Sequence, residues 1–381
     1  MLVGVPKEIK ADENRVGLTP TSVREVVEHG HPVIVESQAG ASIDFYDDDY
    51  REAGAEIVDD AASVFARAEM IVKVKEPQPS ETRRLRRDQI LFTYLHLAPD
   101  PEQTTGLQES GCLAIAYETV TSERGTLPLL APMSEVAGRM AVQAGARCLE
   151  KIMGGRGLLL GGVPGVGPAQ VVVLGGGVAG NNAIRMATGL GADVTVIDKS
   201  LPRLAELDDQ YMGRIRTIHS TVEAVEHAVL NADLVIGTVL LPGRAAPKLV
   251  KRELVRRMKA GAVIVDVSVD QGGCCETTRA TTHREPTYIA DGVVHYCVAN
   301  MPGAVARTST IALNNATLPF VLRLADSGIW PSLAADPHLA NGLNVCRGEI
   351  TYEAVARDLG RPYTAPEHFI NGGRGPDAAG T

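Results

Sequence analysis

Short runs of consecutive apolar residues alternate with amphipathic helical patterns over the first 120 residues. Runs of this kind are typical of strands buried on both faces, as in a parallel sheet covered by helices. One helix start is clear, because Thr19 and Pro20 stand in the order of an N-cap and a first turn, and Gly30 ends that helix. We therefore expect strands at Leu2–Val5, Val33–Glu36, Ile71–Lys75, Ile90–His96 and Leu113–Glu118.

A long helical pattern separates this series from a second one of the same kind. Residues Met133–Ile152 are alanine-rich and free of proline, and the apolar positions from Val136 to Cys148 repeat every four residues along one face. Thr308–Ala325 predicts a second long helix, in which Pro319 favours a bend. The strands expected between these two helices are Val171–Leu174, Val194–Asp198, Leu234–Val239, Val263–Val269 and Val294–Val298.

This order predicts an α/β protein with two doubly wound domains, one inserted into the other. A length of 381 residues also suits two domains. We expect an outer, discontinuous substrate domain from residues 1–130 and 308–370, and an inserted nucleotide-binding domain at 131–307. The two long helices would join them, and the polar, glycine-rich stretch 371–381 would form a flexible tail.

Composition narrows the function classes. The chain is 45% hydrophobic, which excludes global disorder, and its formal net charge of −9 disfavours nucleic acid or an anionic membrane as a partner. No apolar stretch is long enough to span a bilayer, and the first residues suggest a strand rather than a signal peptide, so we expect a cytoplasmic protein. The six cysteines form no CxxC motif, which favours buried reduced thiols over a zinc or redox site.

A glycine-rich turn follows the predicted strand Val171–Leu174 and opens a helix. Gly175, Gly177 and Gly180 form a GxGxxG pattern, and Asp198 ends the next strand 18 residues after Gly180. This is the context of a Rossmann dinucleotide fingerprint, in which the helix N-terminus receives the pyrophosphate and the acidic residue the ribose hydroxyls. A carboxylate there favours NAD over NADP, although the nearby Lys199 and Arg203 weaken that preference. The alternative is a glycine-rich turn without a ligand.

Four polar residues stand where ligands collect in open α/β sheets, beyond the carboxyl ends of strands. Lys75, His96 and Asp270 end apolar runs, and Arg15 lies in the loop after the first strand. Two cations, an imidazole and a carboxylate suit a small anionic substrate that loses a hydride while a proton moves. Equally, Lys75 could be solvated, His96 structural, and Asp270 a cap for the next turn. Periodicity does not show that the four converge.

At these residues the chain resembles the alanine dehydrogenase and transhydrogenase N-terminal family, over about residues 1–370. The resemblance implies two Rossmann-like domains, a hexameric assembly, and reversible NAD-dependent deamination of L-alanine to pyruvate and ammonium. The segments that carry it are VPKEIKADENRVGLTP, VKVKEP, LHLA, AYETV, LPLLAPMSEVAGR, GGRGLLLGGVPGV, GADVTVID, DLVIGTVLLPGRAAPKLV, DVSVDQGGC and YCVANMPGAVARTST.

The resemblance also implies roles for individual residues. Arg15 and Lys75 would bind the substrate, His96 would be the general acid–base, and Asp270 would position or activate water. Some relatives hold magnesium between an acidic residue matching Glu118 and a later histidine, but Ser327 stands there in this chain, so no metal is expected. The matching cofactor positions, with the fingerprint, are Ser134, Gly175, Gly177, Val178, Ala179, Gly180, Asp198, Arg203, Ser220, Val239, Leu240, Val267, Ser268, Val269, Asp270, Arg279, Val298, Ala299, Asn300 and Met301.

Two other functions remain open. The first is a soluble NAD(H)-binding subunit of a proton-translocating transhydrogenase, whose relatives carry an Arg-Ala-Gln…Asp loop near the inter-domain helix. The stretch SEVAGRMAVQAG departs from that loop. The second is a non-catalytic NAD-binding module, which would need a damaged catalytic set.

Overall fold

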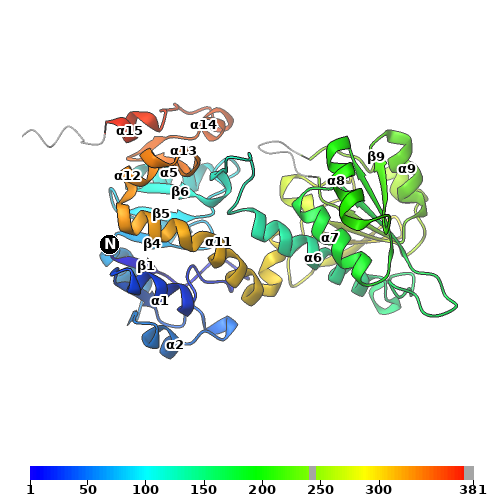
Figure 1. Cartoon of the computed structure of the whole chain (residues 1–381), viewed down its shortest axis with the longest axis horizontal. Helices are drawn as coiled ribbons and strands as arrows, with labels where there is room; N and C mark the ends of the chain where they lie inside the picture. Colours follow the sequence, from blue (N-terminus) through cyan, green and yellow to red (C-terminus); the bar gives the residue numbers. More distant parts are fainter. Residues whose placement is uncertain (240–245, 373–381) are drawn as a thin grey trace, which may run out of the picture. The chain divides into compact units, whose positions relative to one another are not determined.

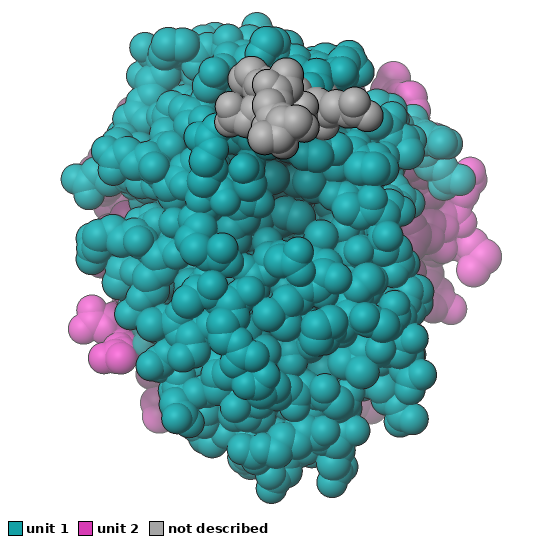
Figure 2. Space-filling model, turned by 90° about the vertical axis from the view of Figure 1, so that its left-hand side faces the viewer, with its two compact units in different colours: residues 1–132, 305–381 teal, residues 133–304 magenta. Residues whose placement is uncertain are grey.

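The computed structural model describes residues 1–239 and 246–372. Packing divides the chain into two compact units, one from residues 1–132 and 305–381 and the other from residues 133–304 (Figure 2). Each is an α/β unit built on its own sheet, as the doubly wound pattern predicts. No helix among the described residues combines the length and apolarity needed to cross a bilayer.

The first unit contains an eight-stranded sheet in the order β15-β14-β6-β5-β4-β1-β2-β3 (Figure 1). Strands β1 to β6 pair in parallel, and β14 pairs antiparallel with β6 and with β15. The strands are β1 (Val3–Val5), β2 (Val33–Glu36), β3 (Glu56–Val58), β4 (Met70–Val72), β5 (Ile90–Thr93), β6 (Leu113–Ala116), β14 (Leu343–Cys346) and β15 (Glu349–Ile350).

The helices of this unit begin where the sequence supplies caps. Thr19 accepts a hydrogen bond from Ser22 N ahead of α1, and Gly30 follows that helix with a φ of 84°, so the predicted start and stop are confirmed. Helices α1 and α11 pack together (Figure 1). The helices are α1 (Pro20–Glu28), α2 (Asp47–Glu52), α3 (Ala61–Arg67), α4 (Pro79–Thr82), α5 (Pro101–Ser110), α11 (Ala306–Ser327), α12 (Ile329–Ala335), α13 (Pro337–Ala340), α14 (Glu353–Leu359) and α15 (Glu367–Asn371).

The second unit contains a seven-stranded sheet in the order β12-β13-β11-β10-β7-β8-β9, parallel except for β12. The chain leaves β7 in one direction and returns to its other side at β10, which makes the carboxyl ends of β7 and β10 the topological switch point. The strands are β7 (Gln170–Leu174), β8 (Asp193–Asp198), β9 (Arg216–His219), β10 (Leu234–Gly237), β11 (Val263–Asp266), β12 (Thr287–Ala290) and β13 (Val293–Tyr296).

The helices of the second unit connect these strands. Helix α6 carries most of the apolar face that the sequence predicts, with Val136, Met140, Ala144 and Cys148 all buried. It spans Ala131–Cys148 rather than 133–152, because the chain turns after Cys148 into a short 3₁₀ segment. The others are α7 (Val178–Gly189), α8 (Leu201–Tyr211), α9 (Val222–Asn231) and α10 (Arg252–Arg257).

Several predicted strands are too long at their carboxyl ends. Strands β4, β5 and β6 end at Val72, Thr93 and Ala116, and β11 passes into a 3₁₀ turn at Val267. The sequence extends these runs because the segments that follow are also buried, and apolar periodicity records burial rather than pairing. The second long helix, α11, continues through Pro319 without a break. The predicted tail lies outside the described residues from 373 onward.

Candidate functional site

Three of the predicted substrate-site residues come from neighbouring elements of the first unit. Lys75 and His96 follow the adjacent parallel strands β4 and β5, whose carboxyl ends lie at one edge of the sheet. Hydrogen bonds continue past the strands: Thr93 Oγ1 donates to Lys75 O over 3.0 Å, and Tyr94 N donates to Val74 O over 3.3 Å. The two loops are therefore held together beyond the regular sheet.

Arg15 is buried, and a neighbouring carboxylate holds its guanidinium. Its Nε and Nη2 atoms lie 2.7 Å and 2.6 Å from the two carboxylate oxygens of Glu13, and the backbone N of Arg15 donates to Oε1 over 3.0 Å. Burial alone lowers the pKa of Arg15, but the Glu13 carboxylate outweighs it and leaves the pKa above its usual value. The guanidinium is thus a fixed, permanently charged group.

Lys75 supplies a second cation to the same region. Burial is the largest cause that lowers the pKa of its amine, and the positive charges of Arg15 and Lys10 lower it further, against the opposing Glu76 carboxylate. Lys75 Nζ lies 3.9 Å from Glu76 Oε2, so its ion pair is loose. Arg15 follows β1 and Lys75 follows β4, and these two strands pair, so two cations stand after neighbouring strands, an arrangement that suits an anionic ligand.

His96 has an unusual backbone for a residue with a side chain. Its φ is 49°, in the left-handed region, which costs energy and is often found at functional positions. Its imidazole lies parallel to the Tyr94 ring, with the ring centroids 5.8 Å apart and an interplanar angle of 2°. The side chain is 43% exposed, so a ligand can reach it.

Glu118 and Tyr94 support His96, and neither was predicted for this task. Glu118 accepts backbone N–H groups from Leu95 and His96, and Tyr94 donates its hydroxyl to Leu129 O over 2.6 Å. The family resemblance draws attention to Glu118 only as a metal position. The available signal for Glu118 was a carboxylate after β6, the strand next to β5 at the same sheet edge, whereas nothing in the pattern distinguishes Tyr94 from other core aromatics. Glu13, two residues from Arg15, was also missed.

The glycine-rich turn of the second unit has the geometry that the fingerprint requires. Gly175 adopts a φ of 97°, and a Cβ on Gly180 would lie 1.9 Å from the carbonyl oxygen of Gly175. A Cβ on Gly177 would meet no atom within 4 Å, so the space in front of the turn is open. Gly177 begins α7 without a side-chain cap, which leaves the helix N-terminus available to an anion.

Asp198 lies beside this turn, as predicted. Its carboxylate accepts hydrogen bonds from Gly176 N over 2.6 Å and from Ser200 N over 2.8 Å. Arg203 donates from Nε to Gly176 O over 2.6 Å, and the backbone N of Ser220 donates to Asp198 O over 2.9 Å. The structure therefore brings together the fingerprint and three of the other predicted cofactor residues.

Further predicted residues follow β10 and β11. Residues 267–271 form a 3₁₀ turn after the buried Asp266, which accepts from Ser268 N and Cys274 N, and this turn carries Asp270. Val239 follows β10, whereas Leu240 lies outside the described residues. A carboxylate oxygen of Asp266 and the thiol sulfurs of Cys274 and Cys275 lie within 4.8 Å of one another, which is the spacing of metal ligands. Asp266 Oδ2, however, already accepts hydrogen bonds from Cys274 N and Thr278 Oγ1, so this carboxylate stabilises the loop.

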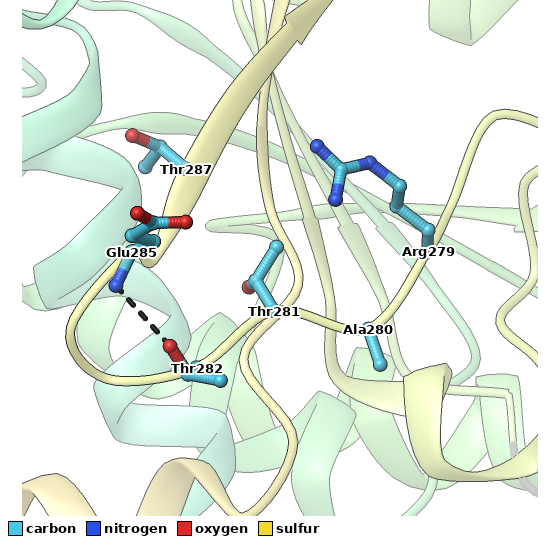
Figure 3. A pocket seen from close by; sticks show the side chains of 6 residues that line it. All are labelled: Arg279, Ala280, Thr281, Thr282, Glu285 and Thr287. Atoms are coloured by element: carbon cyan, nitrogen blue, oxygen red, sulfur yellow. Dashed lines mark hydrogen bonds between the residues drawn. The ribbon is translucent and has the colours of Figure 1, made fainter.

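The segment that carries Arg279 lines a small cavity of about 170 Å³ (Figure 3). The guanidinium of Arg279 lies 4.2 Å from the centroid of the Tyr288 ring, and Tyr288 Oη accepts from Arg279 N over 2.9 Å. The predicted segment 298–301 pairs with this region, since Ala299 N donates to Thr281 O over 3.1 Å. Residues lining the cavity are Arg279, Ala280, Thr281, Thr282, Glu285 and Thr287.

The predicted residues thus fall into two groups. Arg15, Lys75 and His96 belong to the first unit, and Asp270 belongs to the second with the cofactor positions. Ser134 lies in the first turns of α6, apart in sequence from the fingerprint. All six cysteines are buried and form no disulfide, which confirms the expected reduced thiols.

Comparison with known proteins identifies relatives along nearly the whole chain. A curated alanine dehydrogenase from Halomonas elongata is 61% identical over 97% of this chain and 100% of its own length. A solved L-alanine dehydrogenase structure superposes with a TM-score of 0.92 and 54% identity, covering 94% of this chain and 99% of that one. A transhydrogenase structure from Sinorhizobium meliloti gives a TM-score of 0.78 and 25% identity, covering 93% of this chain and 100% of that one.

Two family models together match most of the sequence. The model of the alanine dehydrogenase/PNT N-terminal domain matches residues 4–137, and that of the C-terminal domain matches residues 141–353. Both units are therefore accounted for by one family, and the resemblance seen in the sequence is confirmed. The chain belongs to the alanine dehydrogenase/PNT family.

Proposed function

We propose that the chain catalyses the reversible, NAD-dependent oxidative deamination of L-alanine to pyruvate and ammonium. The observation that carries this proposal is that Lys75 and His96 follow the adjacent strands β4 and β5, while Arg15 follows β1, the neighbour of β4 on its other side. Two cations and an imidazole suit a small carboxylate whose neighbouring carbon exchanges a hydride with the cofactor while protons move at its nitrogen and at water. The names of the full-length relatives support the same reaction.

NAD fits the second unit. The open space before Gly177, the uncapped start of α7 and the carboxylate of Asp198 are the features that a dinucleotide needs. Bound NAD supplies the hydride acceptor, a task for which the protein has no group of its own. The residues proposed to hold it are Ser134, Gly175, Gly177, Val178, Ala179, Gly180, Asp198, Arg203, Ser220, Val239, Leu240, Val267, Ser268, Val269, Asp270, Arg279, Val298, Ala299, Asn300 and Met301.

Arg15 and Lys75 bind the substrate carboxylate in this proposal. Glu13 fixes the Arg15 guanidinium through two hydrogen bonds, so the cation is oriented before the substrate arrives. Lys75 is held only loosely by Glu76, and its amine can therefore turn to the carboxylate or to the keto oxygen of pyruvate. Charge-assisted contacts of this kind are strongest when water is excluded.

His96 moves the protons. Loss of hydride from the alanine Cα leaves an imine, which must add water and then release ammonium. A base takes a proton from the water and an acid returns one to the departing amine, and the imidazole of one histidine suits both tasks. Asp270 would orient the attacking water. Its placement on the turn after β11 ties this role to the cofactor unit.

The transhydrogenase alternative is less well supported. The solved transhydrogenase shares the fold but only 25% identity, against 54% for the solved L-alanine dehydrogenase. The stretch 134–145 also departs from the transhydrogenase loop. A non-catalytic NAD-binding module would lack one of the three polar groups that this chain retains.

A substrate screen tests the proposal. Purified protein is mixed with NADH, ammonium and either pyruvate, glyoxylate or 2-oxobutyrate, and absorbance at the NADH band is followed. We expect fastest loss of NADH with pyruvate, and the reverse reaction with L-alanine and NAD at alkaline pH. A flat trace from protein that binds NADH tightly would contradict the proposed enzyme activity and favour a binding module.

Two further expectations need separate measurements. Light scattering of the same preparation tests the homohexamer that the family resemblance implies. Fractionation of cells tests the expected cytoplasmic location.

A further inference from the structure

A buried ionic triad lies directly behind the segment that carries Lys75. Lys73 Nζ lies 3.0 Å from Glu8 Oε2 and 2.8 Å from Glu81 Oε1. The three side chains are 0%, 2% and 1% exposed. Glu8 comes from the loop after β1, Lys73 follows β4, and Glu81 lies in α4, so the triad joins the loop after β1 to a segment that lies 65 residues further along the chain.

One member of the triad also holds the backbone that leads to Lys75. Glu8 Oε1 accepts the N–H of Val74 over 2.7 Å and the N–H of Lys75 over 3.2 Å. The carbonyl groups of the same two residues accept from Tyr94 N and Thr93 Oγ1. Val74 and Lys75 are therefore each held by a hydrogen bond at the N–H and by another at the carbonyl. Among the described contacts, Glu8 is the only side chain that accepts from these two N–H groups.

Glu81 differs from Glu8 in this respect. Its second oxygen, Oε2, accepts from Gln78 N over 2.8 Å at the start of α4, and it makes no described bond to residues 74 or 75. The two glutamates thus share the cation of Lys73 but hold different backbones. That difference offers a matched pair of variants.

A stabilising role alone does not explain the triad. Two carboxylates share one ammonium in a fully buried place, and burial is the largest cause that raises the pKa of Glu8. Buried ion pairs contribute little net stability because desolvation offsets their attraction, and apolar replacements often do as well. What they fix is geometry, since each charged group tolerates few arrangements of its partners.

We infer that Glu8 is a positioning residue for Lys75: anchored by Lys73, its carboxylate holds the Val74 and Lys75 amides so that the Lys75 amine is aimed at the substrate carboxylate. The inference rests on the proposed function, in which Lys75 binds pyruvate. Glu8 itself touches no substrate. It acts through two peptide groups, and its effect is confined to the geometry of one cation.

The test compares Glu8→Gln with Glu81→Gln. Both remove one negative charge from Lys73 and keep the size of the side chain. In Glu8→Gln the amide cannot accept from Lys73 and from both backbone N–H groups together, whereas Glu81→Gln leaves residues 74 and 75 untouched. The readouts are the Kd of pyruvate for the enzyme–NADH complex without ammonium, the Kd of NADH, kcat and KM for pyruvate, and the thermal midpoint.

We expect Glu8→Gln to raise the Kd and KM for pyruvate about tenfold, with the Kd of NADH within twofold of wild type. Glu81→Gln should change the pyruvate constants less than twofold, even where its thermal midpoint falls as far. Glu8→Asp provides a second variant that keeps the charge but cannot span Lys73 and both amides, and it should show the same rise in the pyruvate Kd.

Three results would overturn the inference: unchanged pyruvate binding in both Glu8 variants, equal losses in Glu8→Gln and Glu81→Gln, or a parallel loss of NADH binding. Failure of Glu8→Gln to fold leaves Glu8→Asp to decide. A wild-type enzyme that neither binds pyruvate nor oxidises NADH with it would instead contradict the proposed function, so the two failures are distinguishable.

Discussion

The carboxylate of Glu118 holds His96 through its backbone: Oε1 lies 2.6 Å from His96 N and 3.7 Å from His96 Nδ1. The same carboxylate accepts from Leu95 N, so two consecutive peptide groups are anchored. A left-handed φ of 49° persists at His96 because these bonds compensate its cost. Removing them should allow the loop to relax and carry the imidazole away from the substrate.

Glu118→Gln should therefore lower kcat/KM for pyruvate about tenfold through His96. An amide accepts fewer hydrogen bonds than a carboxylate and loses the charge assistance. The check is a double-mutant cycle with His96→Ala, measured as kcat/KM. In the His96→Ala background the added Glu118→Gln should change the rate less than twofold. Additive losses would mean that Glu118 acts on the site without His96.

His96→Ala should itself reduce kcat by roughly 10²–10⁴, the usual contribution of a positioned acid–base group. The Kd of NADH should stay near the wild-type value, because the imidazole acts on the substrate. Steady-state kinetics and a fluorescence titration with NADH measure the two quantities. His227→Ala, an exposed change on α9, is the control for loss of any histidine. Near-normal turnover of His96→Ala would remove His96 from the mechanism.

Asp198→Ala should narrow the preference for NAD over NADP. The carboxylate beside Gly176 repels a 2′-phosphate, and Arg203 nearby could then attract it. The ratio of kcat/KM for NADH and NADPH is the measurement. Asp209→Ala, an exposed substitution on α8 with the same charge change, should leave the ratio unaltered. An unaltered ratio in Asp198→Ala would mean that another group selects the cofactor.

The sequence predicts the parts of this molecule that depend on local pattern. The apolar strands β1, β2, β7 and β8 and the turn at Gly175 follow from consecutive apolar residues and glycine spacing. Strands β3, β9, β12, β14 and β15 were not predicted. Four of them, β3, β9, β12 and β15, are the edge strands of their sheets, and β9 is only partly buried, so no continuous apolar run marks them. Strand β14 is buried and lies inside its sheet, but its run of four residues is interrupted by the polar Asn344 and gave no strand signal.

The partners of individual side chains depend on contacts between segments far apart in the chain, and a local sequence pattern does not predict such contacts. Lys73 and Lys75 are alike in sequence, yet one is enclosed by Glu8 and Glu81 and the other has only a loose pair with Glu76. Which lysine faces a ligand is decided by the pleat of the chain beyond β4 and by what packs on each side. Alternation along the run VKVK places both lysines on one face and does not distinguish them.

Gly180→Ala should weaken NADH binding at least tenfold. Its Cβ would lie 1.9 Å from Gly175 O and 2.9 Å from Thr238 Oγ1, so the turn that receives the pyrophosphate must move. Gly189→Ala, in the same helix, would meet no atom within 4 Å and should stabilise the protein slightly, by roughly 0.5–1 kcal/mol of helix propensity. NADH titration and thermal unfolding of both variants measure this contrast. Equal behaviour of the two would contradict the close packing at Gly180.

Lys75 should make the free energy of unfolding rise as pH rises through its pKa, whereas a lysine in an ordinary ion pair makes it fall. Its pKa is lowered in the folded chain, chiefly by burial and then by Arg15 and Lys10, so between the folded and unfolded pKa the unfolded chain binds more protons. The stability cost of burying the charged amine is fully present below the folded pKa and disappears as pH rises toward the unfolded value of about 10.4.

Lys75→Met removes the cost at every pH while keeping the apolar stem. The variant should therefore exceed wild type in free energy of unfolding at pH 7, and the difference should shrink toward pH 10. Urea unfolding at both values measures it, with the exposed Lys251→Met as the control for loss of a lysine charge. A lower stability of Lys75→Met at pH 7 would mean that its amine is satisfied in the fold rather than held ready for a carboxylate. The same variant should lose pyruvate binding, since stability gained here comes from giving up the cation that the substrate needs.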